Sequence, residues 1–330
     1  MKSIHEFLKE SRGGIALLLA LLLVGCNGTF QNPVDILPTS PPVASSAVTT
    51  TKPTSTTTSA PSATPPHTEP DPLPEDAPYR WNPYVFDRLT GAYEADAKAL
   101  VDAILTYADT VTLSGASSAK VVTDNIAFEF PPSALADFKV AGNTVKINYL
   151  HGKEEHQRQI DAFERAVNRG LATLSEEDGE LQRAILLYDY VVKNVVYFTV
   201  DYTDKEITAF SALVAGQTIC YGFADAFGYL LRQTGMEAHL WRGGTYTFTG
   251  FSDHGWCYAK IDGKYYHFDP TWEYSTSKNT QKNSFIYFGL SDKKRFSSLS
   301  KECVSGFGAL EEVCDVTRAD EKLDVTGISQ

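Results

Sequence analysis

The sequence predicts an α+β fold in which a helix that begins at Cys220 packs on an antiparallel sheet. Apolar residues recur at spacings of three and four after Cys220, and the pattern ends at Gly235, a residue typical of a helix C-terminus. Residues 254–269 then form two short stretches separated by Asp262-Gly263, a pair typical of a two-residue β-hairpin turn. A 43% share of apolar residues in 330 is enough for a sizeable core.

The N-terminus has the features of an export signal. Basic residues precede the apolar run IALLLALLLV at residues 15–24, which is too short to cross a bilayer, where roughly 20 helical residues are needed. The run ends in LVGC, which resembles a bacterial lipobox. We therefore expect residues 1–25 to be a lipoprotein signal peptide and Cys26 to carry the lipid that anchors the protein outside the cell membrane. An ordinary secretory signal is the alternative.

A linker is expected from residue 26 to residue 78. This stretch is rich in Pro, Ser and Thr and has no hydrophobic period, so burial cannot offset the entropy cost of ordering it. Proline and threonine keep such a chain extended. We expect a disordered spacer that holds the folded part away from the membrane surface.

Charge and cysteine content argue against several kinds of site. The net charge of −12 argues against nucleic acid as a partner, since a basic surface is expected there. The five cysteines include no CxxC pair and no stretch has EF-hand spacing, so we expect neither a metal nor a cofactor. Cys303 and Cys314 flank a short loop, and in an exported protein such a pair can form a disulfide. Free thiols remain the alternative.

Residues 79–174 are expected to form an accessory region of helices and strands. An aromatic cluster at its start should pack on the folded part (Tyr79, Trp81, Tyr84 and Phe86). Residues 92–110 have a helical period, whereas KVVTDNIAFEF at 120–130 and NTVKINYL at 143–150 favour strands. Residues 153–174 should form a helix with one buried face made of Ile160, Phe163, Ala166, Val167 and Leu171.

Residues 175–330 are expected to form the catalytic domain. Ser175 followed by Asp178 is a helix-cap signature, which predicts a helix through about Asn194. A strand is predicted at residues 238–242, followed by a loop over TYTFTGFSD that reaches His254.

Three side chains in this domain suit nucleophilic chemistry. A helix start favours the thiolate of Cys220, although a cysteine considered alone is more often a small buried hydrophobe. Strand alternation puts His254, Trp256 and Tyr258 on one face and Cys257 on the other. The returning strand places Asp269 beside His254, as a base and its orienting carboxylate require.

Together these segments resemble the transglutaminase-like superfamily, a branch of the papain-like cysteine enzymes. The matching motifs are GQTICYGFADAF, GMEAHLWRGG, HGW and FDPTW, with YDYVVKNVVY and YFGLSDKKR as flanking segments. The resemblance covers roughly residues 180–298 and implies a papain-like core. It also implies a triad in which Cys220 is the nucleophile, His254 the base and Asp269 the orienting carboxylate. Two positions depart from the family pattern, Cys257 after the HGW tryptophan and Ile219 before Cys220.

Other residues have candidate roles around this triad. The side-chain amide of Gln217, three residues before Cys220, could join an oxyanion hole, with a solvent-facing loop glutamine as the alternative. The cleft is expected to be lined by Tyr221, Trp256, His267 and Trp272. His267 is a rival base, and zinc binding by Cys220, His254 and His267 matches no zinc spacing.

The expected function is that of an exported, lipid-anchored cysteine acyl-transfer enzyme acting on amide bonds of proteins or peptides through a thioester. The thioester can then pass to an amine or to water. Two alternatives stay open: a non-catalytic surface-binding module of the same fold, and a hydrolase of cell-wall peptides.

Overall fold

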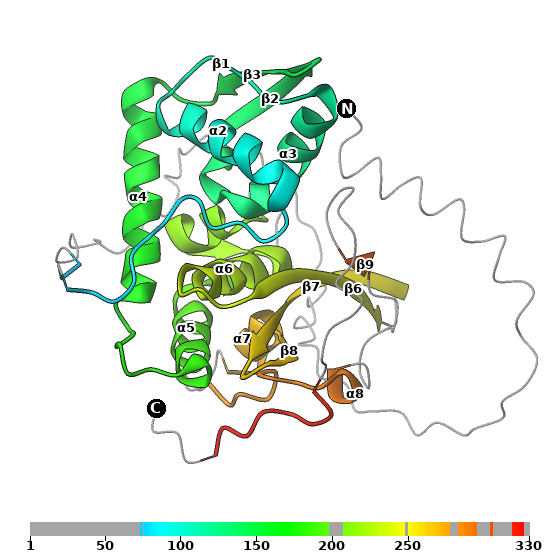
Figure 1. Cartoon of the computed structure of the whole chain (residues 1–330). Coiled ribbons are helices and arrows are strands. Elements are labelled where there is room, and N and C mark those ends of the chain that lie inside the picture. Colours follow the sequence, from blue (N-terminus) through cyan, green and yellow to red (C-terminus); the bar gives the residue numbers. More distant parts are fainter. Residues whose placement is uncertain are drawn as a thin grey trace, which may run out of the picture. The chain divides into compact units, whose positions relative to one another are not determined.

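The structure is a computed structural model that describes residues 73–74, 76–197, 207–247, 250–277, 283–295, 304–305 and 319–326. The chain divides into two compact units after Glu69, and all described residues belong to the second. The expected signal peptide with Cys26, most of the linker, and Cys303 and Cys314 lie outside the described residues. The α+β class is confirmed, with helices packed on antiparallel sheets (Figure 1). No helix within the described ranges is long and apolar enough to cross a membrane.

The N-terminal part of the described chain has a core of its own. It contains a three-stranded antiparallel sheet in the order β1-β3-β2, and two helices pack on it, so that Leu100 of α2 and Ile126 of α3 share a core with Val145 of β3. A 3₁₀ turn, η4, leads into β2. The bounds are η3 Gly91–Tyr93, α2 Glu94–Leu105, β1 Thr110–Thr112, α3 Ala116–Glu129, η4 Pro131–Leu135, β2 Ala136–Ala141 and β3 Thr144–Tyr149.

The strand predicted over residues 120–130 is wrong, because this stretch lies in α3. The buried residues recur at helical spacing: Ala119, Val122 and Ile126. The burial of this helix face outweighs the preference of the valines for a strand. The strand predicted over NTVKINYL is confirmed as β3, which pairs with β2 across a turn at Gly142-Asn143.

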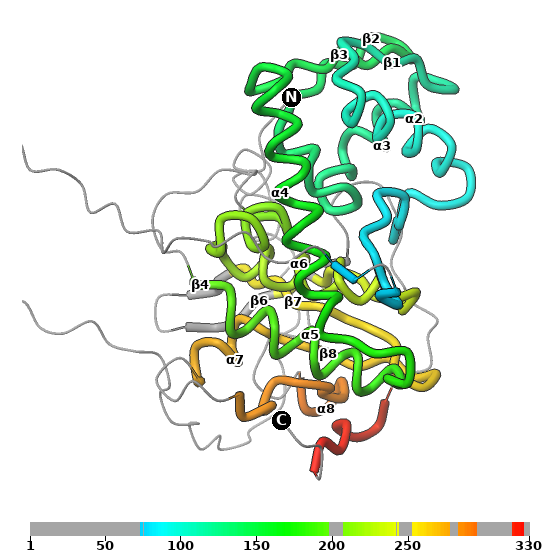
Figure 2. The backbone as a smooth tube through the Cα atoms, turned by 90° about the vertical axis from the view of Figure 1, so that its left-hand side faces the viewer, coloured from blue at the N-terminus to red at the C-terminus, as the bar shows by residue number. Residues whose placement is uncertain are grey.

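Helix α4 (Lys153–Leu171) connects this core to the next one. Near its start, His156 is buried and its Nε2 lies 2.9 Å from the Ile104 carbonyl oxygen of α2. Further along, Phe163 and Val167 belong to the core that contains α6 (Cys220–Gln233). Figures 1 and 2 show α4 running from the three-stranded sheet toward α5 and α6. The buried face predicted for this helix is confirmed.

Helix α5 (Glu180–Asn194) begins later than predicted. Its N-cap is Gly179, whereas the Asp178 carboxylate accepts the Ser175 backbone N–H at 2.7 Å. Ser175 and Asp178 thus form a local turn before the helix, and the predicted cap at Ser175 is wrong. The helix, which is confirmed through Asn194, buries an apolar face that includes Ala184, Ile185, Tyr188, Val191 and Val192.

Helix α6 (Cys220–Gln233) packs on one face of a four-stranded antiparallel sheet in the order β8-β7-β6-β9. All of its residues are buried, and Phe227 joins Cys257 and Phe268 of the sheet in one core. The opposite face carries Trp256, Tyr258 and other aromatic residues. The sheet strands and the short elements around them are β4 Val196–Tyr197, η5 Ser211–Ala215, β5 Gln217–Thr218, β6 Ala238–Thr247, β7 Gly250–Ile261, β8 Lys264–Phe268, α7 Pro270–Ser277, α8 Asp292–Arg295 and β9 Val304–Ser305.

The hairpin turn at Asp262-Gly263 is confirmed, with Ile261 paired to Lys264 and positive φ at both turn residues, 48° and 81°. The loop predicted between Gly244 and His254 is wrong. Residues 245–247 extend β6 and residues 250–253 extend β7, and the two strands stay paired from Gly243 with His254 to Thr247 with Gly250.

The aromatic cluster at the start of the folded part packs as expected at three of its four positions. The indole N–H of Trp81 donates to Tyr229 Oη at 2.8 Å, and the Tyr79 hydroxyl accepts from Arg183 at 2.6 Å. Phe86 is partly buried against the N-terminal core, whereas Tyr84 is exposed.

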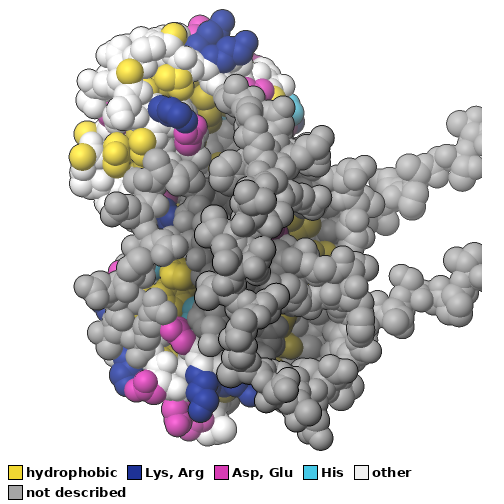
Figure 3. All heavy atoms as spheres, turned by 90° about the vertical axis from the view of Figure 1, so that its right-hand side faces the viewer, with side chains coloured by type: hydrophobic (Ala, Val, Ile, Leu, Met, Phe, Trp, Pro, Cys, Tyr) yellow, Lys and Arg dark blue, Asp and Glu magenta, His cyan; other side chains and the backbone are white. Residues whose placement is uncertain are grey.

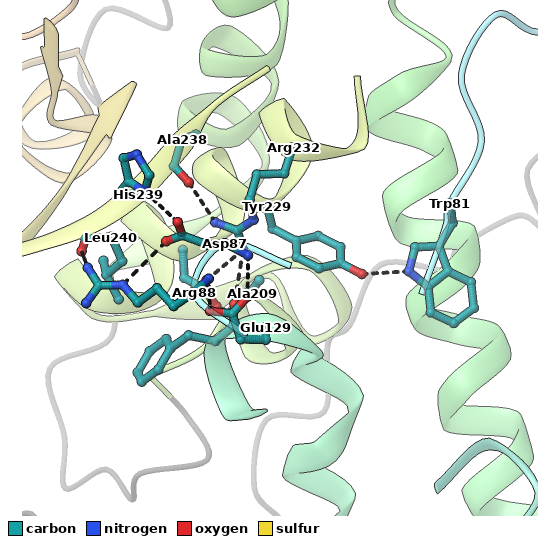
Figure 4. A network of polar contacts seen from close by, with 12 residues as sticks. Trp81, Asp87, Arg88, Glu129, Ala209, Tyr229, Arg232, Ala238, His239 and Leu240 are labelled. Carbon is teal, nitrogen blue, oxygen red and sulfur yellow. Dashed lines mark hydrogen bonds and ion pairs between the residues drawn. The ribbon is translucent and has the colours of Figure 1, made fainter. Parts of the chain in front are cut away.

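A buried network of charged side chains joins residues 87–88, which follow the aromatic cluster, to the C-terminal end of α6 (Figure 4). Arg232 donates to the carbonyl oxygens of Phe128 and Ala238 at 3.0 and 3.2 Å. The Glu129 carboxylate accepts the backbone N–H of Arg88 at 3.0 Å. Burial raises the pKa of Glu129 to about 7, although Arg232 opposes the rise. The network therefore fastens α3 to the end of α6 opposite Cys220.

Basic side chains stand beside acidic ones on the described part of the face in Figure 3. No basic stripe of the kind that binds nucleic acid is visible on that part of the surface.

Candidate active site

Cys220 is the first residue of α6, as predicted. Ile219 is the extended N-cap residue, with φ −102° and ψ −174°. The first N–H groups of a helix have no intrahelical acceptor, so they favour a thiolate at this position and can bind an oxyanion. Gly216, with φ 66°, makes the left-handed turn that precedes β5 and the helix.

The start of α6 is packed tightly around Gly222. A Cβ atom at this position would lie 2.0 Å from Thr218 Oγ1, so glycine is required. The Thr218 side chain accordingly fills the space beside the first turn of the helix. The position of Cys220 is therefore set by close packing around it.

His254 lies between Asp269 and Cys220. Its Nε2 donates to Asp269 Oδ2 at 2.6 Å, and the Cys220 side chain interacts with the same ring. Because Nε2 is engaged by Asp269, the nitrogen left to face Cys220 is Nδ1. Burial lowers the pKa of His254, but the Asp269 carboxylate and the Cys220 side chain together raise it to about 9. The imidazolium form is thus favoured at neutral pH.

Asp269 uses its two oxygens for different partners. Oδ1 accepts the Trp272 backbone N–H at 3.0 Å, which makes Asp269 the N-cap of α7, with Pro270 at the first helical position. Oδ2 faces both His254 and the guanidinium of Arg295, whose Nη2 is 2.8 Å away. Burial raises the pKa of Asp269, but the charges of His254 and Arg295 outweigh it and lower the pKa to about 2.

His267 is held by two other side chains. Trp256 Nε1 donates to its Nδ1 at 2.9 Å, and its Nε2 lies 2.8 Å from Asp292 Oδ1. Both ring nitrogens are therefore engaged away from Cys220, and this arrangement does not favour His267 as a base or as a metal ligand.

The aromatic residues predicted near the site surround His254. Trp272 stacks on the His254 ring at a centroid distance of 5.4 Å, and Trp256 does so at 6.1 Å. The Tyr221 ring lies against Gly255, where a Cβ would come within 2.4 Å of it. The glycine of the HGW motif therefore leaves room for Tyr221.

Cys257 is fully buried in the core beneath α6, facing away from His254 as predicted. Gln217 is exposed in β5, where it pairs with Val196 of β4. Its role in an oxyanion hole stays a prediction. Within the described ranges no group of three or more His, Cys, Asp or Glu side chains is placed to hold a metal ion.

Three residues around the triad were not singled out from the sequence. Arg295 and Asp292 come from α8, and Glu273 comes from α7. The family-like segment YFGLSDKKR contains Asp292 and Arg295, which was a signal that this segment lies near the site. Nothing in its local pattern indicated that Arg295 contacts Asp269.

A family model matches part of the chain. Residues 166–270 match the transglutaminase-like superfamily, which confirms the resemblance seen in the sequence over these residues. The match covers Cys220, His254 and Asp269 and supports a cysteine-based enzymatic role at the level of the family. A comparison with curated proteins found no match.

Solved structures similar to this chain include a candidate cysteine protease from Cytophaga hutchinsonii, with 17% identity, a TM-score of 0.29 and coverage of 39% of this chain and 51% of that one. A structure described as a TGase has 14% identity, a TM-score of 0.29 and coverage of 41% and 44%. A candidate protease from Parabacteroides distasonis has 12% identity, a TM-score of 0.27 and coverage of 38% and 28%. The chain thus spans about half or less of these structures, and likenesses this low carry no argument about activity.

Proposed function

We propose that this chain is an exported, lipid-anchored cysteine acyl-transfer enzyme that acts on amide bonds of proteins or peptides. The observation that carries the proposal is the arrangement of Cys220, His254 and Asp269. A cysteine at a helix start interacts with a buried imidazole, and that imidazole is held by a carboxylate 2.6 Å from its other nitrogen. This is the arrangement of a nucleophile, a base and an orienting group.

In the first half of the reaction, the Cys220 thiolate attacks the amide carbonyl carbon and forms a C–S bond. Negative charge collects on the carbonyl oxygen, where the N–H groups at the start of α6 can stabilise it. The His254 imidazolium gives its proton to the leaving nitrogen as the C–N bond breaks. Ammonia or an amine leaves, and a thioester remains on Cys220.

In the second half, an amine or a water molecule attacks the thioester carbonyl carbon. His254 takes the proton of the attacking group and returns to the imidazolium form, while the C–S bond breaks and Cys220 leaves as the thiolate. An amine acceptor gives transamidation, and water gives hydrolysis or deamidation. Asp269 stays ionised throughout, because its pKa of about 2 lies far below neutral pH.

Export and anchoring are supported by the apolar run at residues 15–24 and the LVGC sequence that ends at Cys26. An enzyme tethered there would meet surface proteins or cell-wall peptides as substrates. Mass spectrometry of the protein from bacterial membranes tests this part, since a diacylglyceryl group on Cys26 is expected and an unmodified Cys26 contradicts the anchor.

The chain carries an internal control for the nucleophile. Cys220 and Cys257 are both buried thiols, but only Cys220 interacts with a histidine, and burial raises the pKa of Cys257. Labelling with iodoacetamide at pH 7 should therefore modify Cys220 much faster than Cys257, as measured by peptide mass spectrometry. Equal rates at the two thiols, with function unchanged in Cys220→Ala, would favour a binding module of the same fold.

The acyl acceptor is tested separately. Incubation with a glutamine-containing peptide should release ammonia, and a primary amine should become incorporated if the enzyme is a transferase. Cleavage of the peptide chain, or release of free amino groups from purified cell wall, would point to a peptide hydrolase instead. Cys220→Ala should abolish whichever activity is found.

A further inference from the structure

We propose that Arg295 is a positioning residue for the candidate triad. Arg295 holds the Asp269 carboxylate in place, and Asp269 in turn orients His254. The effect of Arg295 on the reactivity of Cys220 rests on the proposed function. Arg295 Nη2 lies 2.8 Å from Asp269 Oδ2, the same oxygen that accepts from His254 Nε2 at 2.6 Å. One carboxylate oxygen therefore joins a permanent cation to the candidate base.

The guanidinium is also fixed by the two tryptophans that flank His254. Its central carbon lies 4.2 Å from the Trp256 ring centroid and 5.3 Å from that of Trp272. The same rings stack on His254. A planar guanidinium suits this position, because it can lie against aromatic faces while it contacts a carboxylate.

Burial decides between positioning and substrate binding. The Arg295 side chain is 1% exposed, and so is that of Asp269. A cation this inaccessible does not meet a substrate carboxylate, so it acts on the reaction through the buried groups that it contacts, Asp269 and the two tryptophans. Asp269 is the one of these that carries the opposite charge.

The short helix α8 makes a second ion pair with the chain near Asp269. Asp292, three residues before Arg295, lies 2.8 Å from His267 Nε2, and His267 is two residues before Asp269. The Asp269 backbone N–H donates to the Tyr287 carbonyl oxygen at 2.9 Å, and His267 and Leu290 exchange backbone hydrogen bonds. Residues 287–295 thus hold the end of β8, where Asp269 emerges, by both backbone and side chains.

The charges around Arg295 explain why a neutral substitute should not serve. Arg295 acts electrostatically on Asp269 and on the hydroxyls of Tyr188 and Tyr287. Asp269 and Glu273 of α7 act on the same two hydroxyls. Two positive groups therefore act on the Asp269 carboxylate, the permanent cation of Arg295 and the ring of His254. Without Arg295, Asp269 would take up a proton more readily and lose its fixed orientation toward His254.

The test compares Arg295→Gln and Arg295→Lys with the wild-type full chain. The first readout is the proton NMR resonance of His254 Nε2–H, which is expected far downfield because of its short bond to Asp269. We expect the resonance to be lost to exchange in Arg295→Gln and to be weaker but present in Arg295→Lys. An unchanged resonance in a folded Arg295→Gln overturns the inference, whether or not the protein has an activity.

The second readout is the iodoacetamide labelling rate of Cys220 as a function of pH. In Arg295→Gln the acid limb of this profile should move to higher pH by about one unit, roughly tenfold in rate on that limb. Arg295→Lys should lie between this variant and the wild type. A wild-type Cys220 no faster than Cys257 would overturn the proposed function, while the NMR result would still decide the role of Arg295.

Arg183→Gln is the matched control. Arg183 also lies over an aromatic ring, 5.7 Å from the Tyr79 centroid, and donates to the Tyr79 hydroxyl. This variant should keep both the downfield resonance and the pH profile. If Arg295→Gln does not fold, Arg295→Lys serves as the test. An ammonium cannot lie flat against Trp256, so this variant should differ from the wild type. A wild-type resonance and a wild-type pH profile in Arg295→Lys would overturn the inference.

Discussion

Asp269 accepts the backbone N–H of Trp272 at 3.0 Å with the oxygen that does not face His254. The residue is therefore a helix cap and an orienting carboxylate at the same time. This explains the order of the FDPTW motif: the aspartate caps α7, Pro270 begins the helix, and Trp272 reaches back to stack on His254.

Asp269→Asn should separate these two roles. The amide oxygen can still cap α7, but the neutral side chain leaves buried Arg295 without its counter-charge and favours the wrong tautomer of His254. We expect kcat to fall by about 10²–10⁴ and the free energy of unfolding to fall by about 3–5 kcal/mol. Kinetics with the substrate found for the wild type and urea denaturation measure the two effects. Wild-type kcat in the folded variant would contradict the triad.

The ion pair between His254 and Asp269 should make stability depend on pH. The folded pKa of His254 is raised from 6.5 to about 9, so its stabilising contribution is complete below pH 6.5 and is lost as the pH rises through 9. The contribution is at most about 3 kcal/mol. At the acid end, the pKa of Asp269 is lowered from 3.8 to about 2, so stability is lost as the pH falls from 3.8 through 2. Both pKa shifts include the interaction between His254 and Asp269, so the two contributions to stability are not added.

A Cys220→Ala background, which removes the titration of the thiol, allows this pH dependence to be measured. The difference in unfolding free energy between this protein and the same protein with His254→Gln should shrink from pH 6.5 to pH 9.5. Urea denaturation at several pH values gives the difference. A difference that stays constant or grows with pH would show that the imidazolium is not the stabilised form.

Glu273 should be required for the segment that packs behind Asp269. The side chain is fully buried, and its carboxyl group accepts the Ser284 N–H and hydroxyl, the Phe285 N–H and the Tyr287 N–H at 2.7–3.0 Å. Glu273→Gln replaces one acceptor oxygen by a donor that would face these donors. We expect the unfolding free energy to fall by about 3 kcal/mol.

Glu237→Gln is the control for this prediction, because Glu237 is part-exposed and its ion pair with Lys260 lies at the surface. Its cost should stay within about 0.5 kcal/mol. Hydrogen exchange should also show faster exchange of the Asp269 amide in Glu273→Gln, since that amide donates to Tyr287. Equal stability of the two variants would contradict the anchoring role of Glu273.

The parts of the site that were predicted correctly depend on residues that are close together in the sequence. The start of α6 at Cys220, its end before Gly235 and the turn at Asp262-Gly263 each depend on residues close together in the chain. The pairing of His254 with Asp269 follows from the same hairpin, because the turn sets the register of the two strands.

The parts that were missed depend on distant contacts or on ambiguous periods. Over residues 120–130, β-branched and apolar residues suit either a strand or a helix, and packing on the N-terminal core decides for α3. Arg295 is 26 positions after Asp269 in the chain, and helix α7 lies between them in the sequence. Since neither residue type nor spacing encodes such a contact, only the folded chain reveals it.

The two glycines inside α6 should respond in opposite ways to alanine. In Gly228→Ala the new Cβ would lie 3.5 Å from its nearest neighbours, Arg232 Nη1 and Cys257 Sγ, which is ordinary contact. Because alanine favours a helix over glycine, this variant should be more stable by up to about 1 kcal/mol. In Gly222→Ala the new Cβ would lie 2.0 Å from Thr218 Oγ1 and 2.8 Å from Thr218 Cβ.

Gly222→Ala should therefore lose about 1–3 kcal/mol in spite of its better helix propensity. The clash lies two residues after Cys220, so relief requires a shift of the helix start and of the thiol relative to His254. Iodoacetamide labelling of Cys220 should slow in Gly222→Ala and stay at the wild-type rate in Gly228→Ala, with thermal unfolding measured on both. If the two variants label at the same rate, the close packing of Thr218 on Gly222 does not set the position of Cys220.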